Sequence, residues 1–492
     1  MEWTKERRYT RLHEVEQEEI AELSKTVNES PWRQSFHIQP VTGLLNDPNG
    51  FSFFNGEYHL FYQWFPLGPV HGLKYWYHTK SRDLVHWENI GIAIEPKDYF
   101  DSHGAYSGSA IEHNGELHLM YTGNTRDENW ERHPYQCVAV MDRQGMISKR
   151  ENPVISTLPK GYTAHFRDPK VWKSGETFYA VIGAQRINET GCVLLYSSPN
   201  MSDWKWEGEI KTGLTSFGYM WECPDYFEWQ EKGVLIFSPQ GLPPKGDEYH
   251  NIYQSGYILG EKLNFEDRSL MHGDFKELDR GFDFYAPQTM LDSMGRRILI
   301  GWMGLPELVY PTDRYGWAHC LTLPREITIQ GDQLLQKPVQ ELALLRSEKV
   351  EVKVNIDNNT VEVAEFSGET YELMAEFTER SALMFGVELR VGEKEKTIIY
   401  YDQTSNKVIF DRTYSGEPFA TQYGTVRKCN LNASALKLHI FVDVSSVEVF
   451  VNDGAEVFTA RIFPKKDSTG IRFFAQDGQV NLRATKWTID KR

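Results

Sequence analysis

The sequence predicts an all-β protein: a five-bladed β-propeller followed by a C-terminal β-sandwich. Three observations indicate this fold: short apolar strands recur at a regular period, helical periodicity is confined to the N-terminus, and period-two alternation fills the C-terminal third. Aromatic residues make up 13% of the 492 residues, which suits strands. We expect four parts: an N-terminal helical extension (1–31), the propeller (32–335), a linker (336–348) and the sandwich (349–492).

The N-terminal extension carries the one helical pattern. Residues 10–30 are expected to form a single amphipathic helix that stops before Pro31, and we expect it to pack on the propeller or cap it. Its apolar stripe comprises Leu12, Val15, Ile20, Leu23 and Val27.

The propeller is predicted by an internal repeat. A glycine turn followed by an apolar, aromatic-rich strand occurs five times, and the repeats start 59, 60, 58 and 62 residues apart: GEYHLFYQ from Gly56, GELHLMYTG from Gly115, GETFYAVIG from Gly175, GVLIFSPQ from Gly233 and GRRILIGW from Gly295. A second short strand precedes each one: GFSFF, GSAIEH, PKVWK, PDYFEW and PQTMLD. Five hairpins at a regular period are typical of five blades around a central channel.

Three carboxylates stand just ahead of these first strands. The five preceding segments read NDPNG, YSGSA, RDP, ECP and FYAPQ, and they contain Asp47, Asp168 and Glu222. Because the innermost strands of all blades start near one mouth of the channel, we expect these acids to converge there. Acids that converge repel each other and lower the stability of the fold. We therefore expect a function that offsets this cost.

A structural alternative exists for each of these acids. Asp-Pro-Asn-Gly from Asp47 is what a tight β-turn prefers, Asp168 also precedes a proline, and Glu222 could be a solvated surface residue. The convergence of all three at one mouth favours the functional interpretation.

Charge and motif content exclude several classes of partner. The net charge of −16 and the lack of a basic stripe argue against nucleic acid and anionic membranes. The N-terminus lacks the apolar core of a secretory signal, so we expect a cytoplasmic protein. Five scattered cysteines without a CxxC pair argue against a disulfide framework or a zinc site. No metal or organic cofactor is implied.

Paired carboxylates indicate sugar chemistry. Two carboxyl groups that face one scissile bond are the usual equipment of a glycosidase, and a third can hold sugar hydroxyls. Aromatic side chains near the same mouth would supply apolar faces for sugar rings, although each one is also a candidate for the core: Trp64, Trp76, Trp221, Tyr285 and Trp302.

The motifs together resemble glycoside hydrolase family 32, the invertase and fructosidase group. NDPNG, FYQ, SGSA, RDP, ECP and DFYAPQ occur in the family's order, and DVSSVEVFVNDG (443–454) resembles its sandwich domain. Within the family, GLLNDPNGF, HFRDPKV, GFDFYAPQT, ILIGWMGLPE and WAHCLTLPRE resemble the bacterial sucrose-6-phosphate hydrolases. The resemblance covers the chain from about residue 32 to its end.

The resemblance assigns roles to matching positions. It implies that Asp47 is the nucleophile, that Glu222 is the general acid and then the base, and that Asp168 binds fructose hydroxyls. Retention of configuration is implied, with the two carboxyl groups roughly 5 to 5.5 Å apart. The substrate contacts that we expect are Asn46, Gln63, Trp76, Ser107, Arg167, Tyr285 and Trp302.

The resemblance is less specific for the rest of the substrate. QWFPLG replaces the usual run after Gln63, and His71 stands where a tryptophan is frequent. The expected reaction releases fructose and glucose 6-phosphate, with plain sucrose cleaved less efficiently. The candidates for phosphate binding are Lys74, Arg126, His133, Arg186 and Arg314, although each one taken singly is more typical of a solvated surface charge.

The sandwich and two rival functions complete the expectations. We expect the sandwich to buttress the propeller or to form a homodimer, rather than to bind carbohydrate. One rival is a β-fructosidase, invertase, fructanase or arabinan-type enzyme without phosphate preference. The other is a propeller that binds sugar without turning it over.

Overall fold

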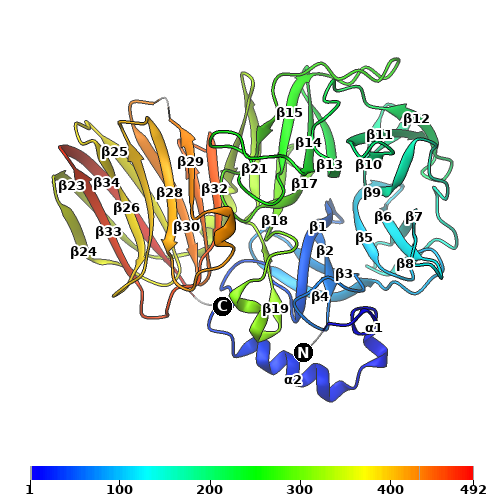
Figure 1. Ribbon diagram of the computed structural model, residues 1–492, viewed down its shortest axis with the longest axis horizontal. Coiled ribbons are helices and arrows are strands. Elements are labelled where there is room, and N and C mark those ends of the chain that lie inside the picture. The colour runs from blue at the N-terminus through cyan, green and yellow to red at the C-terminus, as the bar shows by residue number, and fades with distance from the viewer. Residues whose placement is uncertain (1–2, 432, 491–492) are drawn as a thin grey trace.

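The computed structural model describes residues 3–431 and 433–490. Figure 1 shows two bodies side by side, with the five-bladed propeller, coloured blue to green, on the right and the sandwich, coloured yellow to red, on the left. Strands dominate both bodies, so the predicted all-β class is confirmed. Within the described residues, no helix is long and apolar enough to span a bilayer.

The propeller consists of five antiparallel sheets. Blade 1 contains β1 (Gly43–Phe54), β2 (Glu57–Phe65), β3 (Tyr75–Ser81) and β4 (Trp87–Ile94). Blade 2 contains β5 (Ala105–His113), β6 (Glu116–Arg126), β7 (Arg132–Met141) and β8 (Ile147–Lys149). Blade 3 contains β9 (Tyr162–Ser174), β10 (Thr177–Arg186), β11 (Gly191–Ser198) and β12 (Lys205–Glu209).

The last two blades continue the pattern. Blade 4 contains β13 (Met220–Trp229), β14 (Lys232–Gln240), β15 (Gly256–Glu261) and β16 (Lys276–Glu277). Blade 5 contains β17 (Tyr285–Leu291), β18 (Arg297–Met303), β20 (Cys320–Leu321), β21 (Arg325–Gln330) and β22 (Gln333–Pro338). All five hairpins that the repeat predicted are present as the first two strands of the blades.

A short parallel pairing closes the ring. β19 (Trp317–Ala318), which follows the 3-10 helix η2 (Pro311–Tyr315), lies beside the start of β1, and Gly43 is in register with Trp317. Blade 5 is thereby tied to blade 1, so the five blades form one closed ring around the channel.

The sandwich has two six-stranded sheets. One has the order β23-β34-β25-β30-β31-β32, and the other has the order β24-β33-β26-β27-β28-β29. Their bounds are β23 (Arg346–Asp357), β24 (Thr360–Ser367), β25 (Tyr371–Thr378), β26 (Met384–Val391), β27 (Lys396–Asp402), β28 (Lys407–Tyr414), β29 (Val426–Asn430), β30 (Leu436–Asp443), β31 (Ser446–Val451), β32 (Glu456–Arg461), β33 (Gly470–Gln476) and β34 (Gln479–Ile489). Two further 3-10 helices are η3 (Gln340–Leu345), ahead of β23, and η4 (Thr421–Tyr423), ahead of β29.

The N-terminal segment differs from the single helix that we expected over residues 10–30. It forms α1 (Lys5–Arg8), the 3-10 helix η1 (Leu12–Glu14) and α2 (Gln17–Asn28). The chain is extended at Arg11, whose guanidinium donates to the carbonyl of Pro96. The backbone N–H of Leu12 donates to the hydroxyl of Tyr75. These bonds to the propeller replace intrahelical ones, which delays the long helix until Gln17.

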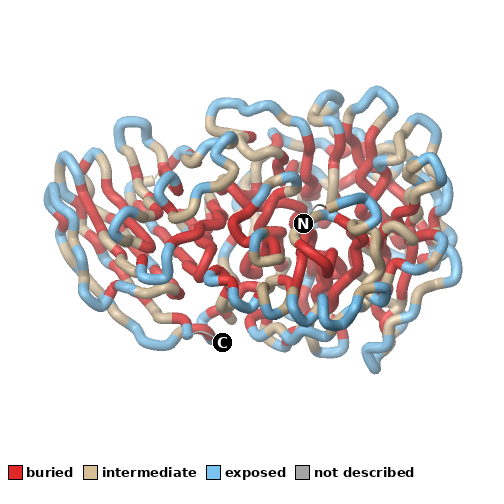
Figure 2. The backbone as a smooth tube through the Cα atoms, turned by 60° about the horizontal axis from the view of Figure 1, so that its bottom comes forward, coloured by how far each residue is buried: buried red, intermediate tan, exposed pale blue. Residues whose placement is uncertain are grey.

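The junction between propeller and sandwich is buried, as the red segments between the two bodies show in Figure 2. A fully buried network of charges lies in it. His37 contacts Asp443 (2.7 Å) and Glu448 (3.0 Å), and Arg325 contacts Glu448 (2.7 Å) and Asp279 (3.0 Å). Each carboxylate has a cationic partner, which is the condition under which buried charges are tolerated.

We expect His37→Gln to lower the free energy of unfolding by about 3 kcal/mol near pH 6. Burial lowers the pKa of His37, but its bonds to Asp443 and Glu448 raise it, and the result is a pKa of about 9. Because the pKa is higher in the folded state, the contribution is complete below the unfolded value of about 6.5. It is lost as the pH rises through about 9. Chemical unfolding between pH 6 and 10 measures this.

His86→Gln is the matched control, because the exposed His86 also pairs with an aspartate, Asp83. Its effect on stability is expected to stay below about 1 kcal/mol. A constant difference between His37→Gln and wild type from pH 6 to pH 10 would contradict the linkage.

Candidate active site

Each innermost strand carries a β-bulge at the same end of the channel. The register shifts fall between Asn46 and Pro48 in β1, Ala105 and Gly108 in β5, and Glu222 and Asp225 in β13. In β9 and β17 they lie at the matching segments 167–170 and 285–288. A bulge re-aims side chains and is common beside active sites. Five bulges therefore point a ring of side chains into one mouth.

The backbone at these bulges is left-handed immediately before a proline. The φ angles are 38° at Asp47, 68° at Asp168, 47° at Cys223 and 48° at Ala286. Non-glycine residues rarely adopt such angles, and they concentrate at functional sites. In blade 2, Ser107 occupies the position equivalent to these left-handed residues. The bulges of all five blades together line a narrow space.

The three predicted acids are not at equivalent positions. Asp47 and Asp168 are the left-handed residues of their bulges, whereas Glu222 precedes the left-handed residue of its own, Cys223. Glu222 therefore corresponds to Asn46 and Arg167. The carboxylates come from two adjacent positions of the repeat and approach the site from different directions.

All three acids line one cavity of about 220 Å³. The exposed fraction is 9% for Asp47 and 5% for Asp168, and Glu222 is half-buried. Carboxyl groups from blades 1, 3 and 4 thus face a single hollow that is large enough for part of a small ligand.

Asp47 is fixed through one oxygen. Its Oδ2 accepts hydrogen bonds from Ser107 Oγ (2.5 Å) and Gln63 Nε2 (3.1 Å), and the Sγ of Cys223 lies 3.7 Å away. Burial raises the pKa of Asp47, the bond from Ser107 lowers it, and the charge of Glu222 raises it further. The side chain is oriented within a crowded, partly desolvated site.

Asp168 has the most strongly perturbed environment of the aspartates in the cavity. The backbone N–H of Cys223 donates to its Oδ2 (3.1 Å), and Arg167 Nε is 4.0 Å from the same oxygen. Burial raises the pKa of Asp168, Arg167 opposes this, and Glu222 and Asp47 add to it, so that the pKa is about 7. Asp168 is therefore partly protonated near neutral pH.

Glu222 is held from three sides. Its Oε1 accepts from Arg167 Nη2 (2.7 Å) and Nε (2.9 Å), and its Oε2 accepts from Tyr285 Oη (2.7 Å) and Gln240 Nε2 (2.8 Å). These contacts fix the carboxyl group rigidly, as proton transfer in a set direction requires.

The expected substrate contacts are brought together with one exception. Asn46, Gln63, Arg167, Tyr285 and Trp302 line the cavity, and Ser107 reaches it through its bond to Asp47. Trp76 does not line it: the side chain is fully buried in the core between blades 1 and 2. Its indole N–H donates to the carbonyl of Tyr106 (2.9 Å), so the expectation for Trp76 is wrong.

The other aromatics divide in the same way. Trp64 donates to the carbonyl of Thr42, and Trp221 stacks on Phe237 in the core between blades 3 and 4. Period-two alternation could not have separated the groups, because Trp64 and Trp76 lie on strands whose burial is nearly continuous. Only Tyr285 and Trp302 of the five present a face to the cavity.

Several lining residues were missed by sequence reasoning. They are Tyr9, Gly72, Tyr106, Arg132, Gln240, Tyr253, Pro306 and Glu307. Tyr106 precedes Ser107 and Gln240 ends the predicted strand GVLIFSPQ, so the repeat contained a signal for both. Tyr9 had none, because nothing local indicates that the N-terminal segment reaches the channel mouth.

One of the five phosphate candidates lines the cavity. Lys74 does so, and its Nζ donates to Asn46 Oδ1 (2.6 Å); burial lowers its pKa to about 7, although Asp47 opposes this. Arg186 pairs with Glu209, Arg314 with Glu417 and His133 with Asp127. Arg126 lies beside the cavity residue Arg132.

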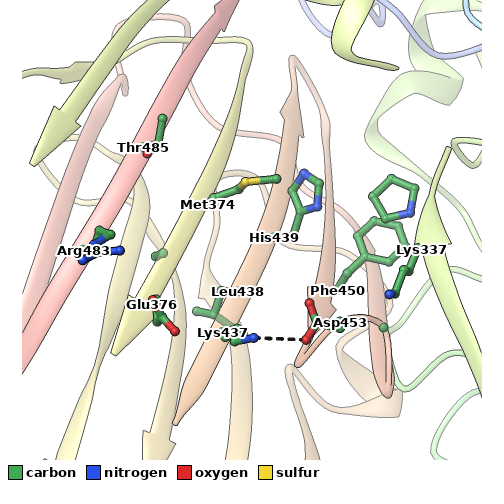
Figure 3. A pocket seen from close by; sticks show the side chains of 13 residues that line it. Lys337, Met374, Glu376, Lys437, Leu438, His439, Phe450, Asp453, Arg483 and Thr485 are labelled. Carbon is green, nitrogen blue, oxygen red and sulfur yellow. Dashed lines mark hydrogen bonds and ion pairs between the residues drawn. The ribbon is translucent and has the colours of Figure 1, made fainter. Parts of the chain in front are cut away.

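A second cavity, of about 440 Å³, opens on the sandwich (Figure 3). Its acidic residues are Glu376 and Asp453, and Asp453 is paired with Lys437 (3.2 Å). It is larger than the propeller cavity but lacks the converging carboxylates. Across residues 3–431 and 433–490, no three His, Cys, Asp or Glu side chains are grouped so as to hold a metal ion.

Comparison with known families finds a match over both bodies of the molecule. The family model "Glycosyl hydrolases family 32 N-terminal domain" matches residues 37–338, and "Glycosyl hydrolases family 32 C terminal" matches residues 341–489. Together they span almost all of the propeller and the sandwich.

Individual proteins agree with the family models. A sucrose-6-phosphate hydrolase of Staphylococcus xylosus is 47% identical over 488 residues, which is 99% of each chain, and one of Bacillus subtilis is 40% identical over 96% and 97% of the two chains. The solved structure of a Lactobacillus gasseri sucrose-6-phosphate hydrolase superposes with a TM-score of 0.92 at 37% identity and covers 100% of both chains. A Bombyx mori GH32 β-fructofuranosidase superposes with a TM-score of 0.81 at 34% identity, over 96% of this chain and 97% of that one. The chain belongs to glycosyl hydrolase family 32 and is a glycosidase with a sugar substrate.

Proposed function

We propose that the protein is a retaining β-fructofuranosidase that cleaves sucrose 6-phosphate into fructose and glucose 6-phosphate, and sucrose less efficiently. The observation that carries this proposal is the single cavity onto which Asp47, Asp168 and Glu222 open. The relatives named above supply the substrate class.

In the first step, Asp47 attacks the anomeric carbon of the fructosyl unit. The hydrogen bonds from Ser107 and Gln63 both fall on Oδ2, so we assign Oδ1 as the oxygen that bonds to carbon. Glu222 donates its proton to the glycosidic oxygen as that bond breaks, and glucose 6-phosphate departs. A covalent fructosyl ester of Asp47 results.

In the second step, Glu222 removes a proton from water. The water oxygen attacks the anomeric carbon, the ester bond breaks, and Asp47 regains its charge. Two inversions give fructose with retained configuration. Asp168 binds fructose hydroxyls, because it lines the same cavity as both other acids.

Asn46, Gln63 and Tyr285 are the polar contacts that we assign to fructose, and Trp302 supplies an apolar face. Ser107 orients the nucleophile rather than the sugar. A homodimer and a cytoplasmic location stay predictions from the sequence.

A substrate panel tests the proposal. We expect a higher kcat/KM for sucrose 6-phosphate than for sucrose, by about ten- to several-hundred-fold, because one or two charge-assisted contacts to phosphate are each worth about 1.5 to 3 kcal/mol. Fructose release is measured with each substrate and with an inulin-type fructan.

Each outcome selects one function. Equal efficiency on the two sucrose substrates would reject the phosphate preference and leave an invertase. Preference for the polymer would identify a fructanase. Binding without any fructose release would identify the non-catalytic propeller.

A further inference from the structure

One wall of the catalytic cavity comes from outside the matched family regions. The N-terminal family model begins at residue 37, yet Tyr9 lines the cavity. On the same wall, Arg132 of β7 lines the cavity as well. The N-terminal segment and the β6–β7 hairpin of blade 2 therefore build this side together.

The N-terminal segment and the β6–β7 hairpin pack directly against each other. Tyr9 packs edge-on against Trp130 at the hairpin tip (ring centroids 5.2 Å apart) and against His103 (5.5 Å). Lys5 Nζ lies 3.2 Å from the centroid of the Trp130 ring. The carbonyl of Arg8 accepts from the backbone N–H of Leu73 (2.7 Å), which anchors the segment to blade 1. The wall has a fixed shape.

This wall is positively charged in a chain whose net charge is −16. Arg126 and Arg132 are directly opposite each other in the hairpin register. Like charges in that arrangement repel. Among the described residues, neither has a carboxylate within ion-pair distance, and the Nε atoms of both are buried without a hydrogen-bond partner. The pair lacks the anion that would balance it.

His165 and several carboxylates also lie near these two arginines. Burial lowers the pKa of His165, and Arg167, Arg132 and Arg126 lower it further, to about 4. The acidic neighbours are engaged elsewhere: Glu222 is bound by Arg167, and Asp127 accepts from His133 and from backbone N–H groups of its own hairpin. Arg132 therefore presents uncompensated positive charge to the cavity, with Arg126 directly beside it.

The β6–β7 hairpin extends beyond the level of Asp47 by a distance that suits the leaving group. β6 pairs with β5 up to Gly123, which is in register with Ala105 near the bulge at Ser107. It then runs three residues further to Arg126. At about 3.3 Å per residue, the two arginines stand roughly 10 Å beyond the level where Asp47 is held. An aglycone that extends from Asp47 along this hairpin would reach them.

We propose that Arg132 and Arg126, with Tyr9 as the adjoining wall, form the subsite that binds the phosphate of a phosphorylated leaving group. This inference rests on the proposed function. Two guanidinium groups match a phosphate dianion through paired N–H donors, and the buried Nε atoms supply unused ones. Lys74 instead belongs to the fructose end, where it holds Asn46.

The test compares Arg132→Gln, Arg126→Gln and the double variant on sucrose 6-phosphate and sucrose. The readout is the ratio of the two kcat/KM values. We expect it to fall about ten- to a hundred-fold for each single variant, and further for the double variant. Arg132→Lys should recover part of the ratio, because lysine keeps the charge without the paired donors.

Arg143→Gln is the matched control. It removes an exposed arginine from the turn at the opposite end of blade 2, and the ratio should stay at the wild-type value. Unchanged ratios in Arg132→Gln and Arg126→Gln would overturn the subsite.

Binding of glucose 6-phosphate gives an independent readout. Calorimetry on the wild type should detect glucose 6-phosphate more tightly bound than glucose, and Arg132→Gln should abolish the difference. This measurement needs no turnover, so it tests the subsite even if the wild type hydrolyses neither sucrose nor sucrose 6-phosphate. Wild-type protein that binds both sugars equally would overturn the inference.

Discussion

Asp47→Asn is expected to lower kcat by at least about 10⁴-fold with both sucrose and sucrose 6-phosphate. The amide is neutral and a poor nucleophile, so the fructosyl ester does not form. Asparagine has the same shape and can still contact Ser107 and Gln63, so the fold should be kept. Steady-state fructose release measures the loss, and calorimetry with sucrose 6-phosphate shows whether the substrate still binds.

Asp83→Asn is the control within the same blade. Asp83 lies in the turn between β3 and β4 and accepts hydrogen bonds from the backbone of Val85 and His86. This variant is expected to change stability and not kcat. A residual activity of Asp47→Asn within about a hundredfold of the wild type would exclude Asp47 as the nucleophile.

The propeller could be predicted because its signal is repetitive and local. Each blade needs a glycine turn and an apolar second strand, so the five hairpins appear at even spacing in the sequence. The outer strands are weaker signals: β8 and β16 are only three and two residues long. Closure through β19 and β1 could not be predicted, because it joins segments more than 270 residues apart through two registered pairs.

The acids could be found because the bulges repeat, but their relative placement could not. NDP and RDP place the acid directly before proline, and ECP places it one residue earlier. Only the structure shows that the residue before proline is left-handed, so that the two positions face different directions. Trp76 shows a related limit. A tryptophan two residues before a polar His78 suits either face of a strand, and packing between blades buries it.

The N-terminal segment illustrates long-range determination most clearly. Its apolar stripe was visible, but the break at Arg11 depends on partners about 60 to 90 residues away. Tyr9 enters the cavity only because that break directs the preceding chain across the loop between β2 and β3. The local pattern therefore predicts a helix, and tertiary contacts decide where it begins and where the chain before it lies.

Glu222→Gln is expected to lower kcat for sucrose 6-phosphate by about 10²- to 10⁴-fold, because the amide can neither donate the proton to the leaving oxygen nor accept one from water. The loss should depend on the leaving group. Fructosyl fluoride needs no protonation, so its first step should survive, and the fructosyl ester on Asp47 should accumulate. A rapid fluoride burst followed by slow turnover, with a covalent adduct detected by mass spectrometry, is the expected result.

Azide separates the two roles of Glu222, since this anion attacks carbon without a general base. With Glu222→Gln, added azide should restore turnover of fructosyl fluoride and give fructosyl azide. Glu307→Gln is the matched control: Glu307 lines the same cavity but accepts a hydrogen bond from Tyr253 (2.9 Å) and does not contact Arg167. Its dependence on leaving group should equal that of the wild type. Azide rescue of Glu307→Gln, with none for Glu222→Gln, would move the acid–base role from one glutamate to the other.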